Sequence, residues 1–298
     1  MADRFNIGVI GVHGGWSTES LSHQLQSVGA GGAILQTSEI GYDLETGCFH
    51  HPSSNLAAFD ALIIKKIGRQ YSPWLNDELV LLQRLEAMGI RCFSSPSRLR
   101  NIVSRLSCTM TLRENNIPMP PTFVTQDVEA AIDWVDQHGP TVLKPLYSTK
   151  ARGMQLLKNA RTAKHVLKAA TKRGERLMYL QQLVDVDDRD YGLVFLGDRY
   201  IGAYARVGDG SVWHTSTGGG GKYAPCKPTE EQIELAYRAQ RPFGLDFTCV
   251  DLAVSQESGS VIWEVSAFGG YKGLHQATGT DASALLTEHV IRTLSCGH

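Results

Sequence analysis

The sequence predicts an α/β protein in which a parallel sheet precedes a strand-rich second half. Within residues 1–95, short β-branched runs alternate with segments of helical periodicity, a pattern typical of parallel strands joined by helices. From residue 178 onward strand-like runs dominate, with one inserted helix and a closing helix. The 298 residues, 42% of them hydrophobic, are enough for one large domain or two to three modest ones.

The N-terminal part is expected to form four strands and two helices. In order, these are a strand at 6–12, a helix at 18–28, strands at 33–36 and 62–65, a helix at 74–88 and a strand at 91–94. A Ser-Ser-Pro-Ser run that ends at Ser97 then interrupts the pattern. We therefore expect an N-terminal domain over residues 1–97.

The second half begins with a helix that is expected to run to Glu114 and to stop before Asn-Asn-Ile-Pro-Met-Pro-Pro. Asp127 is the expected start of an amphipathic helix. The remaining expected elements are a strand at 141–145, a loop at 148–153, a strand at 154–157, a helix near 230–241 and a closing helix at 281–294. Thr-Glu-Glu-Gln at 229–232 is a capping-box pattern.

Composition excludes several classes of protein. The 29 basic residues nearly balance the 30 acidic ones, so we expect no general partner among nucleic acids or acidic membranes. The apolar runs are far shorter than the ~20 residues of a membrane-spanning helix, and the N-terminus has no signal pattern. The six scattered cysteines, with no Cys-x-x-Cys pair, predict free thiols. A soluble, cytoplasmic protein is expected.

Two carboxylates are expected to face each other near the C-terminus. The strand-like runs 247–254 and 261–265 are joined by a short polar segment. A hairpin centred on Glu257 and Ser258 pairs Asp251 with Glu264, at a Cβ separation of ~5 Å. Like charges this close require a cation or a shared proton, and hard cations such as Mg²⁺ take oxygen ligands. The pattern alone leaves open a solvated acid, a bulge that breaks the register, and a general acid–base pair.

A phosphate site is expected where the strand at 141–145 ends. Lys144 closes this apolar strand, and the following loop, Tyr-Ser-Thr-Lys-Ala-Arg-Gly, is small and basic. Its backbone amides, with Lys144 and Arg152, suit phosphate binding, although a surface lysine beside an ordinary loop fits the local pattern equally well. The glycines at 218–221 miss the P-loop pattern, and those at 11–15 miss the dinucleotide spacing.

Together these segments resemble the ATP-grasp superfamily, specifically the RimK-like alpha-L-glutamate ligases. The resemblance covers about residues 100–295. It is carried by Asn-Ile-Pro-Met-Pro at 116–120, Val-Leu-Lys-Pro at 142–145, Gln-Gln-Leu-Val at 181–184, Asp190 before a strand, Val-Asp-Leu at 250–252, and Glu-Val-Ser at 264–266 followed by Gly-Gly-Tyr-Lys-Gly at 269–273. The order and spacing of these segments are specific.

The resemblance implies an ATP-grasp fold with an N-terminal Rossmann-like domain and two α+β subdomains, about 98–178 and 179–298, that clamp ATP. It implies ATP and Mg²⁺ (or Mn²⁺) as cofactors. The implied nucleotide-binding residues are Arg105, Lys144, Ser148, Arg152, Gly153, Gln181, Gln182, Leu183, Val184, Asp190, Thr215 and Ser216. Among them, the resemblance implies that residues 181–184 form the adenine hinge and that Asp190 lies near the ribose. The implied metal ligands are Asp251, Glu264 and Ser266. Arg206, His214 and Lys272 are the expected catalytic residues, near the acyl group or a substrate carboxylate, and Lys272 is expected in a glycine turn that follows the strand at 261–265.

Several positions depart from the family pattern. Arg105 stands where the family has a lysine, and it keeps the charge. Gly192 replaces the arginine of the usual Asp-Ile-Arg. His214 and Ser216 replace an arginine and an asparagine, and Ser266 replaces the asparagine that completes the metal set.

The implied activity is that of an ATP-dependent ligase that joins a carboxylate to an amine through an acyl phosphate and releases ADP and phosphate. The expected substrates are a small-molecule or peptide carboxylate and an amine or amino acid; homo-oligomerisation is left open. Two alternatives remain at this point. One is a catalytically silent nucleotide-binding regulatory protein, which the residues at 192, 216 and 266 favour. The other is an NAD-dependent enzyme that uses the N-terminal sheet.

Overall fold

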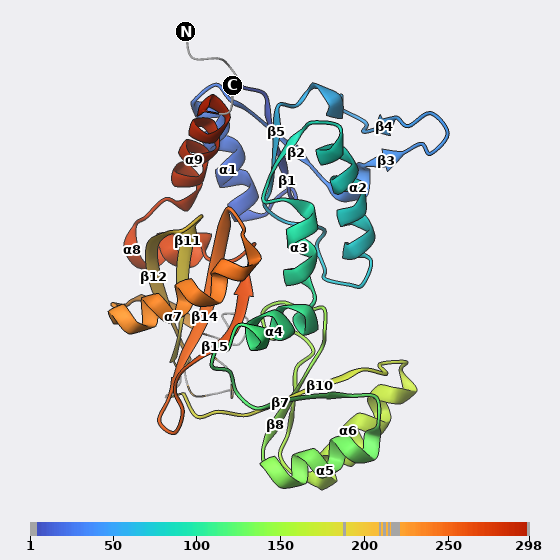
Figure 1. Cartoon of the computed structure of the whole chain (residues 1–298), viewed down its shortest axis with the longest axis vertical. Helices are drawn as coiled ribbons and strands as arrows, with labels where there is room; N and C mark the ends of the chain where they lie inside the picture. Colours follow the sequence, from blue (N-terminus) through green and yellow to red (C-terminus); the bar gives the residue numbers. More distant parts are fainter. Residues whose placement is uncertain are drawn as a thin grey trace.

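The computed structural model describes residues 5–186, 189–208, 210, 213, 215 and 221–296, and the statements below refer to these residues. Three main sheets follow one another along the molecule, and both chain termini lie at the end formed by the first sheet (Figure 1). Within the described residues, no helix has the length and apolarity required to cross a membrane. All six cysteines are free thiols.

The first sheet is parallel, with the strand order β2-β1-β5-β6. Its strands are β1 (Ile7–Ile10), β2 (Gly31–Leu35), β5 (Ala61–Ile64) and β6 (Arg91–Phe93), and its helices are α1 (Trp16–Ser27) and α2 (Leu75–Ala87). Every residue of β1 and β5 is buried, as expected for a parallel sheet that is covered on both faces. The predicted alternation of strands and helices is confirmed. Gly15 precedes α1 as its N-cap, so the first glycines turn the chain into that helix.

A small hairpin in this part was not predicted. It is formed by β3 (Gly41–Tyr42) and β4 (Phe49–His50), with the short 3-10 helices η1 (Thr37–Glu39) and η2 (Leu56–Ala58) on either side. Two-residue strands are too short to show a periodicity of two in the sequence.

The predicted single helix before Glu114 is wrong, because the structure has two helices there. They are α3 (Pro96–Val103) and α4 (Arg105–Glu114), separated by Ser104 in an extended conformation (φ −90°, ψ 123°). The backbone amide of Arg105 donates to the carbonyl of Leu146, 2.9 Å away, which lies 41 residues later. A tertiary contact therefore interrupts a segment whose local pattern reads as continuous helix.

The second sheet is antiparallel, with the order β7-β10-β8-β9, and α5 and α6 lie together beside it (Figure 1). Its elements are β7 (Thr122–Thr125), α5 (Val128–His138), β8 (Thr141–Lys144), β9 (Gln155–Leu157), α6 (Ala160–Lys172) and β10 (Met178–Gln182). Asp127 caps α5 as predicted, accepting from the amides of Glu129 and Ala130. Helix α6 was not predicted; a capping box of Asn159 and Thr162 begins it.

The third sheet is antiparallel, with the order β13-β12-β11-β14-β15. Its strands are β11 (Arg189–Leu196), β12 (Arg199–Val207), β13 (Lys222–Pro225), β14 (Phe247–Ser255) and β15 (Gly259–Ser266). The accompanying helices are α7 (Glu230–Gln240), η4 (Arg241–Phe243), α8 (Tyr271–Thr278) and α9 (Ala282–Cys296). The capping box predicted at Thr229 and Gln232 is confirmed at the start of α7.

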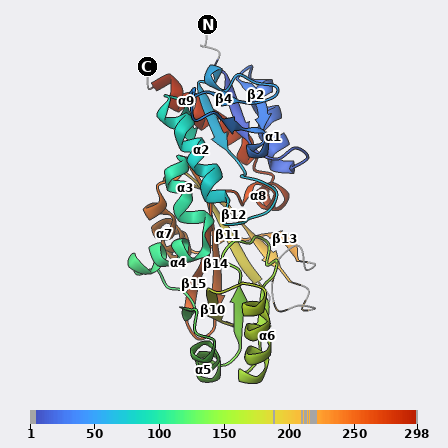
Figure 2. The ribbon, with the colours of Figure 1, turned by 90° about the vertical axis from the view of Figure 1, so that its right-hand side faces the viewer.

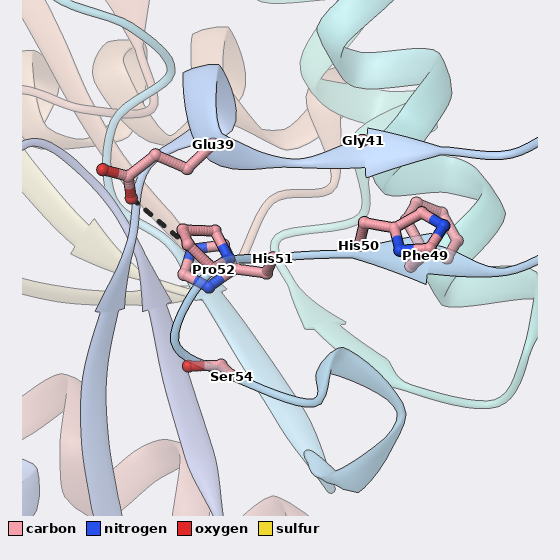
Figure 3. Close-up of a pocket in the computed structure, with 7 residues that line it drawn as sticks. All are labelled: Glu39, Gly41, Phe49, His50, His51, Pro52 and Ser54. Carbon is pink, nitrogen blue, oxygen red and sulfur yellow. Dashed lines mark ion pairs between the residues drawn. The ribbon is translucent and has the colours of Figure 1, made fainter.

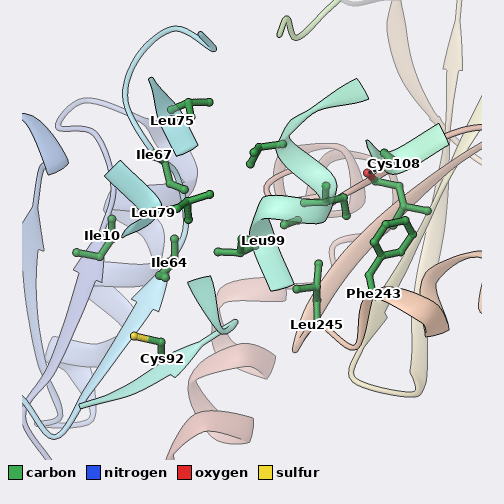
Figure 4. Packing of buried hydrophobic residues seen from close by; sticks show 14 of the residues in the cluster. Ile10, Ile64, Ile67, Leu75, Leu79, Cys92, Leu99, Cys108, Phe243 and Leu245 are labelled. Carbon is green, nitrogen blue, oxygen red and sulfur yellow. Dashed lines mark hydrogen bonds between the residues drawn. The ribbon is translucent and has the colours of Figure 1, made fainter. Parts of the chain in front are cut away.

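The buried cores show which sheets share packing. One cluster is continuous from the first sheet through α2 and α3 to the third sheet, and Figure 4 shows part of it from Ile10 and Ile64 through Leu99 to Leu245. A separate cluster lies between the second sheet and α5 and α6, with Leu143 and Leu180 among its members. The second sheet therefore has a core of its own, whereas the first and third sheets are packed as one body.

Gly192 of β11 shows why this chain lacks the family arginine at that position. Gly192 pairs with Tyr204 of the neighbouring strand, and a Cβ at Gly192 would collide with the Tyr204 ring. The same ring would lie 2.6 Å from a Cβ at Gly273 of α8. Tyr204 is buried, so its ring cannot swing into solvent. Two glycines thus make room for one aromatic side chain that joins β12 to α8.

We expect Gly192→Ala to lower the free energy of unfolding by about 1–3 kcal/mol, because overpacking a filled core forces neighbouring groups to move. Chemical denaturation of the parent and the variant measures this change. Gly41→Ala is the matched control: it is also a strand glycine, but the nearest atom to its added Cβ lies 3.7 Å away. Equal stability of the two alanine variants would contradict the packing role of Gly192.

Candidate active site

The predicted pairing of Asp251 with Glu264 is confirmed, although the turn of the hairpin and the register of its strands differ from those predicted. The β14–β15 turn is centred on Glu257, because Ser255 pairs with Gly259. From that turn, a regular ladder would bring Trp263 opposite Asp251. A register shift between Leu252 and Asp251 makes Trp263 the extra residue, so Glu264 takes its place. The bulge compensates for the difference in turn position.

Each of these carboxylates is paired with an arginine from another element. Arg105 Nη1 lies 3.0 Å from Glu264 Oε2, and Arg206 Nη2 lies 3.1 Å from Asp251 Oδ1. The arginine side chains are largely buried, whereas those of Asp251 and Glu264 remain 24% and 36% exposed. The two acids therefore stay accessible to a bound ion or substrate.

Arg206 also holds Asp190, which is its partner across β11 and β12. Its Nε donates to Asp190 Oδ1 at 2.9 Å and its Nη2 to Oδ2 at 2.7 Å, in a bidentate arrangement. Burial raises the pKa of Asp251 to about 7 and the nearby Asp190 and Glu264 carboxylates add to the rise, while Arg206 opposes it. Asp190 was predicted near the ribose; the structure places both of its oxygens on Arg206.

Lys144 lies on the face of the second sheet opposite to α5 and α6. Strand alternation directs Leu143 toward those helices and Lys144 away from them. Lys144 Nζ donates to Gln181 Oε1 and lies 4.9 Å from the centre of the Trp263 ring. Burial lowers the pKa of Lys144 to about 7; Arg105 lowers it further and Glu264 opposes this. Among the described residues, no carboxylate is in hydrogen-bonding contact with this buried lysine.

The other residues of the predicted adenine hinge continue from β10. Gln181 is fully buried, and its amide also donates to Thr122 Oγ1 at 3.0 Å. Gln182 donates to the carbonyl of His138, and the amide of Leu183 donates to that of Pro140. Val184 is half-buried. These bonds tie the segment to the second sheet.

Arg105 connects Glu264 to the loop after β8. Its Nε donates to the carbonyl of Pro145 at 3.0 Å, and its Nη2 to Ser148 Oγ at 3.3 Å. Further along the loop, exposed Arg152 donates to Thr149, and Gly153 has a positive φ of 72°. The structure thus brings Arg105, Lys144, Ser148 and Glu264 together, as predicted for one site.

Lys66 and Arg69 follow β5, and sequence reasoning missed both, although Lys66 interacts electrostatically with the cations of this loop. Burial lowers the pKa of Lys66, and the charges of Lys150, Arg152 and Arg69 lower it further. Lys66 follows β5 and is about 85 residues from Lys150 in sequence. The Lys-Lys pair directly after β5 was the only signal for this cluster.

Lys65 is a second residue that the sequence analysis missed. Its side chain is buried, its Nζ donates to the carbonyl of Phe268 at 2.6 Å, and it lies 4.1 Å from the centre of the Tyr271 ring. Burial lowers the pKa of Lys65 to about 7. Lys65 therefore joins the end of β5 to the loop that follows β15.

The remaining predicted residues are less well connected to this cluster. Ser266 Oγ accepts from the amides of Phe268 and Gly269, both at 3.2 Å, so it shapes the loop after β15; its role as a metal ligand stays a prediction. Lys272 was expected in a glycine-rich turn, but it is exposed in the first turn of α8. Thr215 is half-buried. His214 and Ser216 lie outside the described residues.

A hollow of about 450 Å³ lies elsewhere, on the hairpin side of the first sheet (Figure 3). Its lining is Glu39, Gly41, Phe49, His50, His51, Pro52 and Ser54. His51 Nε2 lies 3.5 Å from Glu39 Oε2. None of the predicted nucleotide or metal residues lines this hollow, so it is not part of the site described above.

The fold and this arrangement of lysine, arginines and paired carboxylates define an ATP-grasp ligase. The model of the RimK-like ATP-grasp domain matches residues 103–290. The chain therefore belongs to the RimK-like ATP-grasp family, whose members form carbon–nitrogen bonds between a carboxylate and an amine.

Similar proteins include the tetrahydromethanopterin:alpha-L-glutamate ligase of Methanosarcina acetivorans, 25% identical over 79% of this chain and 81% of the relative. The alpha-aminoadipate–LysW ligase LysX of Saccharolobus solfataricus is 26% identical over 91% and 92%. Among solved structures, a RimK domain protein ATP-grasp from Sphaerobacter thermophilus has a TM-score of 0.75 at 17% identity over 95% of this chain and 98% of that chain. The ATP-grasp ligase PsnB, in complex with a precursor variant, Mg and ADP, has a TM-score of 0.73 at 16% identity over 98% and 99%.

We expect nucleotide binding to be coupled to protonation of Lys144. A lysine with a pKa of about 7 is largely neutral at pH 8, and a polyphosphate beside it raises that pKa. The parent should therefore take up roughly 0.9 proton per ATP at pH 8 and roughly 0.1 at pH 6 through this group. Calorimetry in buffers of different ionisation enthalpy measures the uptake, and Lys144→Met supplies the background from ATP itself. Equal uptake by both proteins at pH 8 would contradict the assignment.

Proposed function

We propose that this ligase uses ATP to convert a substrate carboxylate into an acyl phosphate, which an amine then attacks. In the first step a carboxylate oxygen bonds to the γ-phosphorus, and the bond from that phosphorus to ADP breaks. In the second step the amine nitrogen bonds to the acyl carbon, phosphate leaves, and the nitrogen loses a proton. The single observation that carries this proposal is the facing pair Asp251 and Glu264 beside buried Lys144.

The residues present fit Mg²⁺ or Mn²⁺. Asp251 and Glu264 offer hard carboxylate oxygens, and their side chains stay 24% and 36% exposed beside the arginines. No set of three or more His, Cys, Asp or Glu side chains suited to a metal occurs in the described part of the chain. We therefore propose that two protein carboxylates hold the ion, with water and phosphate oxygens completing its shell. Bound there, the ion would neutralise charge on the transferring phosphoryl group.

The protein's own cations would act on the same charge. Lys144 would bind a phosphate oxygen, and Arg105 and Arg206 lie beside the two acids, where their fixed positive charge would stabilise a developing anion. The Ser148–Gly153 loop would cover the acyl phosphate and exclude water from it. Lys66 and Arg69, on the first-sheet side of this loop, support an anionic substrate in addition to ATP.

The proposal for the two substrates rests on the relatives of this chain. The relatives are named for adding glutamate to tetrahydromethanopterin and for joining alpha-aminoadipate to LysW. By analogy, we propose a small-molecule or peptide carboxylate and an amine or amino acid. A catalytically silent nucleotide-binding protein is not favoured, because the relatives are named as ligases.

A screen for ADP release tests the activity. Purified protein with ATP and Mg²⁺ is offered mixed pools of acids, of amines, and of both together. We expect ADP release that requires one acid pool and one amine pool at the same time. ATP binding without such release in any combination would overturn the proposed reaction and favour the silent binder.

We expect Asp251→Asn to weaken Mg²⁺-dependent ATP binding by at least about tenfold, because it removes a carboxylate from the ion and from Arg206. In chelator at pH 8, stability should be unchanged or higher. The raised pKa of Asp251 means that its ionised form disfavours the folded state, and this penalty grows from about pH 4 to pH 7 and is lost in the amide.

Titration calorimetry with and without Mg²⁺ measures the first effect, and denaturation in chelator measures the second. Asp133→Asn, on the exposed side of α5, is the matched control and should change neither quantity. Unaltered ATP affinity of Asp251→Asn in saturating Mg²⁺ would remove the metal role from this residue.

A further inference from the structure

A continuous row of basic side chains occupies one face of α6. Its members are Arg161, Lys164, His165, Lys168 and Lys172, all exposed. At 3.6 residues per turn, these positions fall within an arc of about 100°. The opposite face carries Ala163, Leu167 and Ala170, which are buried against the second sheet. Packing therefore explains the apolar face and leaves the cationic face without a structural role.

These five basic residues and Ala169 line an open hollow of about 400 Å³. We call it the α6 basic groove. Lysine and arginine stems are apolar along most of their length, so the groove combines apolar walls with charged ends. A polypeptide with carboxylates at its edges is complementary to such a surface.

The charges of the groove are largely unpaired within the protein. Lys168 Nζ lies 3.8 Å from Glu129 Oε1 of α5, and both side chains are more than half exposed. For Arg161, Lys164, His165 and Lys172, no carboxylate of the described residues lies within 4.0 Å. Like charges three and four residues apart on a helix repel one another. An acidic partner would relieve this repulsion.

The size and setting of the groove favour a peptide over a nucleic acid. The row from residue 161 to residue 172 is about 17 Å long at 1.5 Å per residue, the length of about five residues of extended chain. The protein as a whole has a net charge of −1, so it carries no general positive field that would attract a polyanion. Nucleic-acid binding usually rests on a broader basic surface.

The α6 basic groove is separate from the candidate active site. Helices α5 and α6 cover one face of the second sheet, and Lys144 lies on the other face. The helices also form the end of the molecule opposite both termini, and Figure 2 shows α6 on the outside of that end. A partner in the groove would therefore leave the nucleotide residues free.

We propose that the α6 basic groove docks an acidic peptide segment of a partner protein. This proposal does not depend on the reaction that the active site performs. It requires only that carboxylates spaced along a polypeptide meet the cations of α6.

A labelled peptide of about ten residues that alternates Glu and Gly tests the proposal by fluorescence anisotropy. We expect the parent to bind it, more weakly as salt increases. Lys164→Glu with Lys168→Glu should weaken binding at least about tenfold. The matched control is Lys227→Glu with Arg238→Glu, which changes the net charge equally at exposed positions outside α6 and should stay within about twofold of the parent.

Three further measurements distinguish specific docking from general attraction. A peptide with Gln in place of Glu should not bind. ATP affinity of the Lys164→Glu, Lys168→Glu variant should match that of the parent, which also shows that the variant is folded. No binding by the parent, equal loss in the two charge-reversed variants, or tighter binding of a single-stranded oligonucleotide of equal charge would each overturn the proposal.

Discussion

The site depends on one electrostatic constraint, which is the placement of two carboxylates opposite each other on adjacent strands. Asp251 and Glu264 would destabilise the β14–β15 hairpin if no opposite charge compensated theirs. Arg105 forms an ion pair with Glu264, and Arg206 forms one with Asp251. Each arginine also contacts a further part of the protein. Arg105 holds the loop after β8 through Pro145 and Ser148, and Arg206 holds Asp190. The negative pair therefore organises the positive groups around it.

Arginine and lysine have different roles in this arrangement. The two arginines contact carboxylates, whereas Lys65 and Lys144 each donate to a neutral oxygen, the carbonyl of Phe268 and the amide oxygen of Gln181. Burial lowers the pKa of both lysines to about 7, and no carboxylate in the described part of the chain pairs with either of them. An arginine in these positions would remain charged. A buried lysine with a lowered pKa therefore costs less than a fixed charge at the same place, and an approaching anion would raise that pKa.

Much of the fold could be predicted because its elements carry their own local signals. Asp127 and Thr229 are capping residues that mark the starts of α5 and α7, and the buried strands β1 and β5 read as apolar runs. The break at Ser104 could not be predicted, since it depends on a bond between Arg105 and Leu146. Helix α8 was missed because the glycines before it read as a turn, and they do turn the chain: Gly270 has a φ of 88° and is the N-cap of that helix.

In the candidate site too, contacts within one hairpin could be predicted, whereas contacts between residues distant in sequence could not. Asp251 and Glu264 belong to one hairpin, so counting residues from its turn was enough to predict that they pair. The turn is centred elsewhere than predicted, but the bulge shifts the register back and restores the pairing. Lys65 and Phe268 are 203 residues apart, and no local pattern links them. Gly192 is the clearest case. Taken alone it reads as the loss of a family arginine, but beside Tyr204 it is half of a packed pair, in which the ring fills the space that a side chain at residue 192 would need. A substitution that looks like the loss of a side-chain contact in β11 can thus be required for the packing of a side chain from β12.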